Sequence, residues 1–307
     1  MKRIIMDTDI GTDVDDCLAL AVLLASPEVA LEAVTCVYGD VALRARMVAK
    51  LLRLAGRDDV PVYLGACPPL LGLRPIYWPG HEGLGLLRDD DPPPIGQPLG
   101  AVDLLVETIM ASPGEIHLLA IGPLTNVALA LRKEPHIAQN LASLMIMGGV
   151  FRGPGRFHLP YAEHNIVCDP EAAHIVMTSG APIVLVPLDV TTEVRVFPDG
   201  AAQIRGGGTP YHAAVADQIA RYPGFVARGW THLHDPLAAA LLIDPSFATL
   251  EPLHVEVELG GRLSVAATLA RAPSEAHPAN AQVALGVDAP RFERWFVERA
   301  AGQIVHR

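Results

Sequence analysis

The sequence predicts an α/β protein whose central sheet is mostly parallel and flanked by helices on both faces. Short apolar runs rich in strand-forming residues alternate with longer segments of helical periodicity, which is typical of that architecture. Half of the 307 residues are apolar and the mean hydropathy is +0.31, so the chain can bury a sizeable core. No change of composition marks an interdomain linker, and we therefore expect a single domain over residues 1–307.

The first part of the chain contains two strand–helix pairs. Arg3–Met6 is a short apolar run that we interpret as the first strand. The helical pattern of Asp16–Ala25 follows it and ends at Ser26-Pro27. The second pair is a strand at Leu31–Tyr38 and a helix near Leu43–Ala55. Further strands are expected at Ile116–Ile121, Ser143–Met147 and Ile183–Pro187, and further helices near Asp103–Ala111, Thr125–Lys133 and Asp169–Ser179.

Two segments interrupt this alternation. Arg88–Pro98 holds three acids and four prolines, which excludes a helix interior or a central strand. We interpret it as a surface loop, because the alternation resumes unchanged after it. Gly206–Pro210 is a second break. Beyond Thr249 the pattern predicts strands at Leu253–Leu259, Leu263–Leu269 and Gln282–Val287 and a final helix near Pro290–Ala301.

Charge and cysteine content exclude several classes of protein. The net charge of −11 and the pI near 5.5 argue against nucleic-acid binding, which needs a basic surface, but allow a small neutral substrate. Cys17, Cys36, Cys67 and Cys168 form neither a CxxC pair nor a zinc-spaced set, so we expect reduced, buried thiols. The N-terminus lacks a signal-peptide core, and the apolar run Cys17–Ala25 is too short to span a membrane. The expected location is the cytoplasm.

An acidic turn directly after the first predicted strand is the strongest sign of a site. Five carboxylates occur in the ten residues from Asp7 to Asp16. In open α/β sheets, ligands bind beyond the carboxyl ends of the strands, where this turn begins. Crowded carboxylates repel one another, and a divalent cation relieves the repulsion. Because the donors are all oxygen atoms, Ca²⁺ or Mg²⁺ fits the turn better than zinc does.

The acidic turn also has a simpler interpretation, as the cap of the helix that follows. Acids in a first helical turn complement the helix dipole, which accounts for Asp13 or Asp15 without a metal. Capping does not account for the two acids at the strand end. Gly11 permits a sharp backbone turn, which would let Asp9 and Asp16 face one ion.

Three later segments could complete the site. Gly122-Pro123-Leu124-Thr125-Asn126 follows a predicted strand and opens a helix, and the alternative is a turn that Thr125 caps. His234-Asp235-Pro236 precedes the apolar run Leu237–Ile243, where Asp235 could equally be a helix cap. Glu163-His164-Asn165 reads as extended, so its Glu and Asn would share one face and bind adjacent sugar hydroxyls. A solvated loop is the alternative for this last segment.

Together these segments resemble the inosine-uridine-preferring nucleoside hydrolase family, at least from Arg3 to Pro245. The shared motifs are the aspartate cluster, Gly-x-Leu-Thr-Asn, Met-Gly-Gly, Glu-x-Asn before Asp-Pro-Glu-Ala-Ala, and His-Asp-Pro. Each motif is weak alone, but their order is the family's. The resemblance implies a Rossmann-like nucleoside hydrolase fold and calcium-dependent hydrolysis of the N-glycosidic bond of ribonucleosides, giving ribose and free base. It also implies a homodimer or homotetramer.

The resemblance assigns roles to individual residues. Asp9, Asp16 and Asp235 would bind Ca²⁺ through their carboxylates, and Thr125 through its backbone carbonyl. Asp9 would also take a proton from the metal-bound water, and His234 would assist the departure of the base. The ribose hydroxyls would be bound by Asp15, Glu163 and Asn165, with support for the metal ligands from Asp7 and Asn126.

The chain departs from the family's usual pattern at three places. The turn Gly-Thr-Asp-Val-Asp-Asp is longer than the usual Gly-x-Asp-Asp, so Asp13 has no clear counterpart. Asp40 stands where many members carry a substrate-contacting asparagine, and a carboxylate cannot donate a hydrogen bond unless it is protonated. Arg156–Tyr161 lacks the asparagine that many members place against the ribose 5′-hydroxyl, and His158 is the candidate substitute. The base preference therefore stays open between purine, pyrimidine and modified nucleosides.

Two aromatic residues are weaker candidates for substrate contact. His81 lies near, but not in, the position of a family His-Gly motif. Trp230 could stack on the base, although core or lid packing would explain it equally well.

Two other classes of protein fit part of the pattern. Asp7-x-Asp9 after a strand also fits the nucleophile and acid of a haloacid dehalogenase-type phosphatase. Such an enzyme needs a lysine beside the phosphoryl group, and none of the chain's three lysines is well placed after a later strand. The other class is a calcium- or nucleoside-binding protein without turnover, which Asp40 and the altered 156–161 loop would favour.

Overall fold

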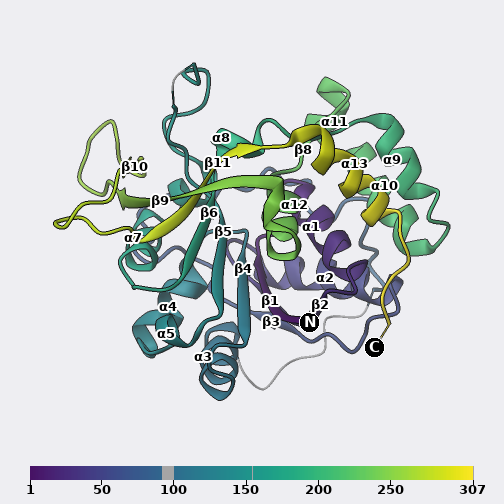
Figure 1. The fold of residues 1–307 in the computed structure, drawn as a ribbon. Helices are drawn as coiled ribbons and strands as arrows, with labels where there is room; N and C mark the ends of the chain where they lie inside the picture. The colour runs from purple at the N-terminus through teal and green to yellow at the C-terminus, as the bar shows by residue number, and fades with distance from the viewer. Residues whose placement is uncertain (92–99, 154, 307) are drawn as a thin grey trace.

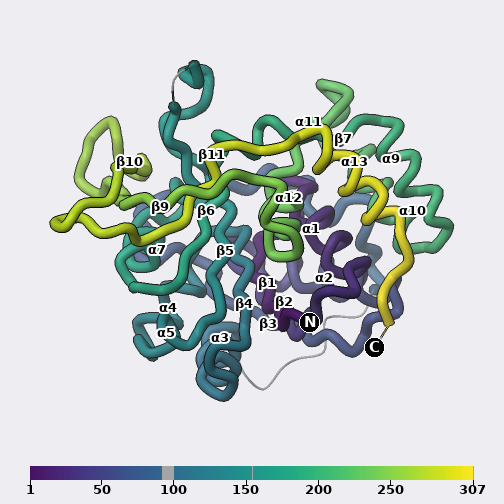
Figure 2. Tube along the Cα trace, viewed as in Figure 1, coloured from purple at the N-terminus to yellow at the C-terminus, as the bar shows by residue number. Residues whose placement is uncertain are grey.

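The fold class is confirmed by the computed structural model, which describes residues 1–91, 100–153 and 155–306. A nine-stranded sheet crosses the molecule in the order β10-β9-β11-β6-β5-β4-β1-β2-β3, with helices on both faces (Figures 1 and 2). Neighbouring strands from β11 to β3 run parallel, whereas β9 is antiparallel to both β11 and β10.

The elements have the following bounds. The strands are β1 Lys2–Thr8, β2 Val29–Cys36, β3 Val62–Leu64, β4 Ile116–Ala120, β5 Ser143–Met147, β6 Ile183–Val186, β7 Arg195–Val196, β8 Thr231–His232, β9 Ala248–Val257, β10 Thr268–Arg271 and β11 Ala281–Val287, with β7 and β8 in a separate ribbon. The helices are α1 Asp15–Leu24, α2 Val41–Leu54, α3 Ala101–Ala111, α4 Thr125–Lys133, α5 Ile137–Asn140, α6 His164–Cys168, α7 Pro170–Met177, α8 Leu188–Thr191, α9 Pro198–Arg205, α10 Pro210–Arg221, α11 Pro223–Arg228, α12 His234–Ile243 and α13 Ala289–Ala300, with a 3₁₀ turn at Pro245–Phe247.

The strand order reverses next to β1. β1 pairs with β2 on one side and with β4 on the other, so the chain leaves β1 in one direction and later returns on the opposite side. Such a switch point opens a crevice beyond the carboxyl ends of the two neighbouring strands. The acidic turn begins at this crevice, because Asp7 at the end of β1 pairs with Thr35 of β2 and Ala120 of β4.

The core has two layers, one on each face of the sheet. Ile4 and Met6 of β1 belong to one layer and Ile5 to the other, as strand alternation requires. Helix α1 lies inside the first layer and all ten of its residues are buried. Each buried leucine of α1 stabilises the fold by about 1.5–3 kcal/mol, which offsets the cost of burying the two acids at its start.

Three predicted strand boundaries were wrong, each for a local reason. Residues 261–267 form tight turns instead of a strand, because Val265 N donates to Gly261 O at 3.0 Å and Ala266 has a φ of +70°. The strand of that region is Thr268–Arg271. β9 starts at Ala248 rather than at Leu253. Pro252 is tolerated inside this strand because β10 pairs only with residues 254–257, so the outer edge of β9 is unpaired at the proline. β2 ends at Cys36, because Tyr38 turns with a φ of +65°.

The two predicted breaks in the strand–helix alternation have different outcomes. Gly206–Pro210 does separate two helices, α9 and α10, neither of which was predicted. In the predicted loop Arg88–Pro98, residues 88–91 hold no helix or strand, and residues 92–98 lie outside the described part of the chain. All four cysteines are free thiols, but Cys67 is exposed rather than buried as expected. In the described ranges, no helix combines the length and apolar character that crossing a membrane requires.

Candidate active site

A cavity of about 520 Å³ opens at the crevice beside β1. A volume of this size is typical of sites for small molecules. The walls come from the β1–α1 turn, the ends of β4 and β5, helix α6 and the start of α12. The lining residues are Asp9, Thr12, Asp13, Asp15, Asp16, Tyr77, Ile121, Met147, Pro160, Ala162, Glu163, His164, Asn165, Val167, Leu188, Tyr222, His234 and Asp235.

Three buried carboxylates meet in this cavity. Asp15 and Asp16 of α1 and Asp235 of α12 bring oxygen atoms within 4.8 Å of one another. Burial, and then repulsion from the neighbouring carboxylates, raises the pKa of each of these carboxyl groups well above its usual range. The group of three differs from the predicted ligand set, because it includes Asp15, expected at the ribose, and leaves out Asp9. Its all-oxygen composition fits a hard divalent cation.

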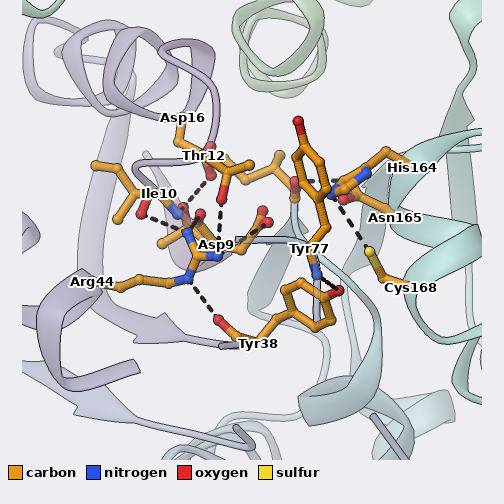
Figure 3. A network of polar contacts seen from close by, with 12 residues as sticks. Asp9, Ile10, Thr12, Asp16, Tyr38, Arg44, Tyr77, His164, Asn165 and Cys168 are labelled. Atoms are coloured by element: carbon orange, nitrogen blue, oxygen red, sulfur yellow. Dashed lines mark hydrogen bonds and ion pairs between the residues drawn. The ribbon is translucent and has the colours of Figure 1, made fainter. Parts of the chain in front are cut away.

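Arg44 of α2 holds the acidic turn in place (Figure 3). This fully buried side chain donates from Nε to Tyr38 O at 2.6 Å and from Nη2 to Thr12 Oγ1 at 3.1 Å. Its Nη1 donates to the backbone carbonyls of Asp9 and, at 2.8 Å, Ile10. Nothing in the sequence pattern pointed to Arg44, because arginine on an amphipathic helix ordinarily faces solvent.

Asp9 lies between Arg44 and the turn that follows β4. Its Oδ2 is 3.8 Å from Arg44 Nη2. A Cβ added to Gly122 would lie 3.0 Å from Asp9 Oδ1 and 2.9 Å from Asp9 N, so that turn packs directly against Asp9. The structure therefore brings the Gly122–Asn126 segment to Asp9, as the predicted site requires.

The two helix-capping alternatives do not describe this site. Leu124 is the N-cap of α4, while Thr125 is buried in the first turn and donates its hydroxyl to Asp169 Oδ2 at 2.7 Å. Leu233 is the N-cap of α12, which leaves Asp235 inside the helix with its carboxylate in the cavity. Neither residue is a cap.

Asp7 and Asn126 lie behind the cavity and do not line it. Asp7 Oδ1 accepts from Asn126 Nδ2 at 2.7 Å and from Thr35 Oγ1 at 2.5 Å. Asn126 Oδ1 in turn accepts from Ala66 N at 2.8 Å. Burial raises the pKa of Asp7 to about 7, although the hydrogen bonds from Asn126 and Thr35 each lower it. The contacts of Asp7 and Asn126 tie the ends of β1 and β2 to α4 and so support the turn that carries Asp9.

Glu163 and Asn165 both line the cavity, but not as an extended pair. Glu163 is the N-cap of α6, and its carboxylate accepts from Asn165 N at 2.8 Å and Gly149 N at 3.1 Å. The Asn165 amide donates to Ile121 O at 3.0 Å and Met147 O at 3.2 Å, at the ends of β4 and β5. The prediction of an extended segment was wrong, because capping by Glu163 starts a helix at His164. Both side chains are instead fixed by backbone groups.

His234 lines the cavity at the start of α12. Its Nδ1 lies 2.7 Å from Thr191 Oγ1. Burial, His232 and Arg228 lower the pKa of His234 to about 3, so the imidazole is neutral at physiological pH. A neutral imidazole can still donate one N–H to a ligand.

Four predicted substrate residues do not line this cavity. Asp40 is exposed and caps α2 by accepting from Leu43 N at 2.9 Å. His158 is exposed. Trp230 packs against His232 with 4.8 Å between ring centroids, and the guanidinium groups of Arg195 and Arg228 also contact its ring. His81 lines an adjoining cavity and contacts Thr12 O at 3.0 Å through Nε2. Their roles in substrate binding stay predictions without geometric support.

An aromatic pair that was not predicted forms another part of the wall (Figure 3). The rings of Tyr77 and His164 meet edge to face at 5.4 Å between centroids. His164 Nε2 lies 3.5 Å from Cys168 Sγ, and Tyr77 N donates to Tyr38 Oη at 2.8 Å. The sequence signal for this pair was the position of His164 between two predicted site residues, Glu163 and Asn165.

Fold and site together define a class: an α/β protein with a small-molecule-sized cavity and a group of buried carboxylates at the switch point of a parallel sheet. The model of the family "Inosine-uridine preferring nucleoside hydrolase" matches residues 4–294. The chain belongs to this family, whose members are hydrolases that act on N-glycosyl compounds.

Individual relatives agree with this assignment. The "Non-specific ribonucleoside hydrolase RihC" of Salmonella newport is 36% identical over 96% of both chains. "Probable uridine nucleosidase 2" of Arabidopsis thaliana is 34% identical over 97% of both chains. Among solved structures, the "Purine-Preferring Ribonucleoside Hydrolase from Gardnerella vaginalis" superposes with a TM-score of 0.87 at 30% identity, covering 98% of both chains.

Proposed function

We propose that this protein is a Ca²⁺-dependent ribonucleoside hydrolase, which cleaves the N-glycosidic bond and releases ribose and free base. The observation that carries the proposal is the buried group Asp15, Asp16 and Asp235 in a cavity of nucleoside size. The names of the relatives, which describe ribonucleoside hydrolases and a uridine nucleosidase, support the reaction type.

The donor set fits Ca²⁺. Asp15, Asp16 and Asp235 would hold the ion, with Asp9 beside them and the backbone carbonyl of Thr125 as a further expected ligand. When bound, the ion would offset the mutual repulsion of the carboxylates and polarise the water and ribose hydroxyls that it contacts. Carboxylates that repel one another in the absence of a cation give a favourable free energy of binding when a cation arrives.

Asp9 is the residue that would take the proton from the attacking water. Its carboxylate lines the cavity beside the three clustered acids. Arg44 holds the backbone that follows the Asp9 side chain, through the carbonyls of Asp9 and Ile10. A base fixed in this way needs little reorganisation to accept a proton, which is what general-base catalysis requires.

Glu163 and Asn165 would orient the ribose. The Glu163 carboxylate and the Asn165 amide are locked by backbone groups, so they present a rigid surface to the sugar. Both Asn165 amide hydrogens point at carbonyls, which leaves its Oδ1 to accept from a ribose hydroxyl. Breaking the ribosyl C–N bond builds positive charge on the sugar, and nearby carboxylates stabilise that charge.

His234→Ala should slow the release of ordinary bases by roughly 10–100-fold in kcat/KM, the size expected for the loss of one hydrogen bond to the leaving group. We expect this because the neutral imidazole can donate its N–H to the departing base. The measurement compares uridine and inosine with p-nitrophenyl riboside, whose leaving group needs no proton, so the mutation should do little to its cleavage. Equal losses on all three substrates would contradict a role at the leaving group and would leave only a packing role.

A base-release screen tests the proposed function. Purine, pyrimidine and modified nucleosides are incubated with the Ca²⁺-supplemented protein, and ribose and free base are quantified together. We expect equimolar release from at least one nucleoside. Nucleoside binding without any release would instead indicate a binding protein, and phosphate release from a generic phosphomonoester would indicate the phosphatase.

A further inference from the structure

One side of the cavity is closed by a hydrogen bond that the proposed function does not use. Tyr222 Oη donates to Asp13 Oδ2 at 2.6 Å, across 209 positions of the chain. Asp13 is the extra acid of the lengthened turn and lies outside the group Asp15, Asp16 and Asp235. A hydrogen bond to a carboxylate is stronger than one between neutral groups, so this contact can hold two distant segments together.

A second cavity of about 210 Å³ lies on the other side of this contact. Among the residues that the structure describes, Asp13 and Tyr222 are the two that line both cavities, and they therefore form the wall between them. Most of the other residues in the lining of the second cavity are apolar, Ile10, Val14 and Met47 among them, while His81, Gln218 and Arg221 form its polar part. The apolar part offers room for an apolar group.

Both ends of the wall are anchored. On one side, the Asp13 turn is held through Thr12, whose hydroxyl accepts from Arg44 and whose carbonyl contacts His81 Nε2 at 3.0 Å. On the other side, Tyr222 joins α10 to α11, and α10 packs against α1 and α2. The ring of Tyr222 also meets that of His81 at 6.4 Å. The hydrogen bond therefore links two supported segments rather than two free side chains.

We propose that the Asp13–Tyr222 hydrogen bond is a partition that limits the size of nucleoside this enzyme accepts. With the partition closed, the substrate is confined to the larger cavity, so nucleosides without bulky apolar substituents are favoured. With it opened, the two cavities join and a benzyl-sized group can enter the second one. This inference rests on the proposed function, because it concerns the same substrate.

The test compares one nucleoside cleaved in the base-release screen with its derivatives that carry a benzyl group on the base or at O5′. Asp13→Ala removes the acceptor, and Tyr222→Phe removes the donor but keeps the ring. Asp13→Asn retains an acceptor oxygen and should behave like the wild type. Tyr211→Phe is the matched control. It also removes a buried tyrosine hydroxyl, but one that has no hydrogen-bond partner among the residues that the structure describes.

We expect the ratio of kcat/KM for a benzylated nucleoside to that for its parent to rise roughly tenfold or more in Asp13→Ala, the range that pocket shape ordinarily controls. Tyr222→Phe should raise the ratio in the same direction, and Tyr211→Phe should leave it unchanged. An unchanged ratio for both benzyl positions in both Asp13→Ala and Tyr222→Phe would overturn the partition. An Asp13→Asn ratio equal to that of Asp13→Ala would overturn it as well, because the bond would then not be the determinant.

A second readout is the ratio of the dissociation constants of the benzylated nucleoside and its parent. It is measured by calorimetry on Ca²⁺-supplemented protein and does not depend on turnover. If the wild type binds nucleosides without releasing base, the proposed function fails while the affinity ratio still decides the partition. If no variant binds either compound, both proposals fail. Tyr222→Phe leaves the acidic turn intact and keeps the test valid should Asp13→Ala lose Ca²⁺ binding.

Discussion

Asp9→Asn should reduce base release by at least roughly 10³-fold, the upper part of the range for loss of a general base. Asparagine has nearly the same size as aspartate but cannot accept a proton from water. Asp9 also lies directly beside the buried acids, so the substitution is expected to weaken Ca²⁺ binding to some degree. Initial rates with uridine and inosine at saturating Ca²⁺ separate the loss of the base from the loss of the metal.

The fold should survive this substitution. Asp9 sits at a strand end, and the Arg44 bonds to its turn go to the backbone carbonyls of Asp9 and Ile10 and to Thr12, which Asp9→Asn retains. Removing one of several repelling acids offsets the loss of the ion pair between Asp9 Oδ2 and Arg44 Nη2, so the unfolding temperature of the metal-free protein should change little. Asp58→Asn, at an exposed acid remote from the cavity, is the matched control and should keep full activity. A tenth or more of the wild-type rate in Asp9→Asn would exclude its role as the base.

The features that the sequence could predict are local ones. The apolar run before Asp7 and the glycine in the turn determine a strand that ends in a sharp acidic loop, whatever packs around it. Strand–helix alternation then predicts a parallel sheet, and a parallel sheet predicts a crevice at its carboxyl edge. This reasoning placed Asp9 and Asp16 at the crevice, and the family resemblance added Asp235; the structure brings all three into one cavity.

The features that the sequence could not predict depend on contacts between distant residues. Arg44 reads as a surface residue of an amphipathic helix, and only the packing of α2 over the acidic turn buries it. The Asp13–Tyr222 bond joins two segments whose approach no periodicity encodes. Helix α6 was missed because five residues give too short a pattern, although Glu163 in its capping position was a usable signal.

Asp15 illustrates a contact within the acidic cluster that sequence spacing could not predict. Two adjacent acids at a helix start point in directions that differ by about 100° in the helix, so sequence spacing cannot say which of them faces a third acid. In the structure both Asp15 and Asp16 approach Asp235, because α1 and α12 pack closely together within the first core layer.

Removing the metal from the wild-type protein is the second change expected to have a large effect. Without the ion, nothing polarises the attacking water, and the clustered carboxylates are free to take up protons. Base release should fall to below roughly a hundredth of its starting value, because polarisation by a metal lowers the barrier by several kcal/mol. Mg²⁺ should restore less activity than Ca²⁺, because Mg²⁺ demands a stricter octahedral ligand set.

The metal-free protein should also become less stable as the pH rises. Burial and mutual repulsion raise the pKa of Asp15, Asp16 and Asp235 in the folded state, so the folded state holds more protons than the unfolded state above about pH 4. The contribution of these three groups to stability therefore falls as the pH increases from that point towards the folded-state pKa values. The lowered pKa values of His232 and His234 give the opposite slope only below about pH 6.5, so calorimetric unfolding temperatures at about pH 7 and pH 9 measure the effect of the carboxyl groups, which Ca²⁺ should reverse.

The most direct measurement follows base release by a single preparation of the wild-type protein through three stages, with uridine and inosine as substrates. The stages are the protein as purified with Ca²⁺, the protein after chelation to a verified metal-free state, and the protein after addition of Ca²⁺ or Zn²⁺. We expect activity in the first stage, its loss in the second, and its recovery with Ca²⁺ but not with Zn²⁺. Full activity in the verified metal-free protein would contradict the proposed calcium-dependent hydrolysis.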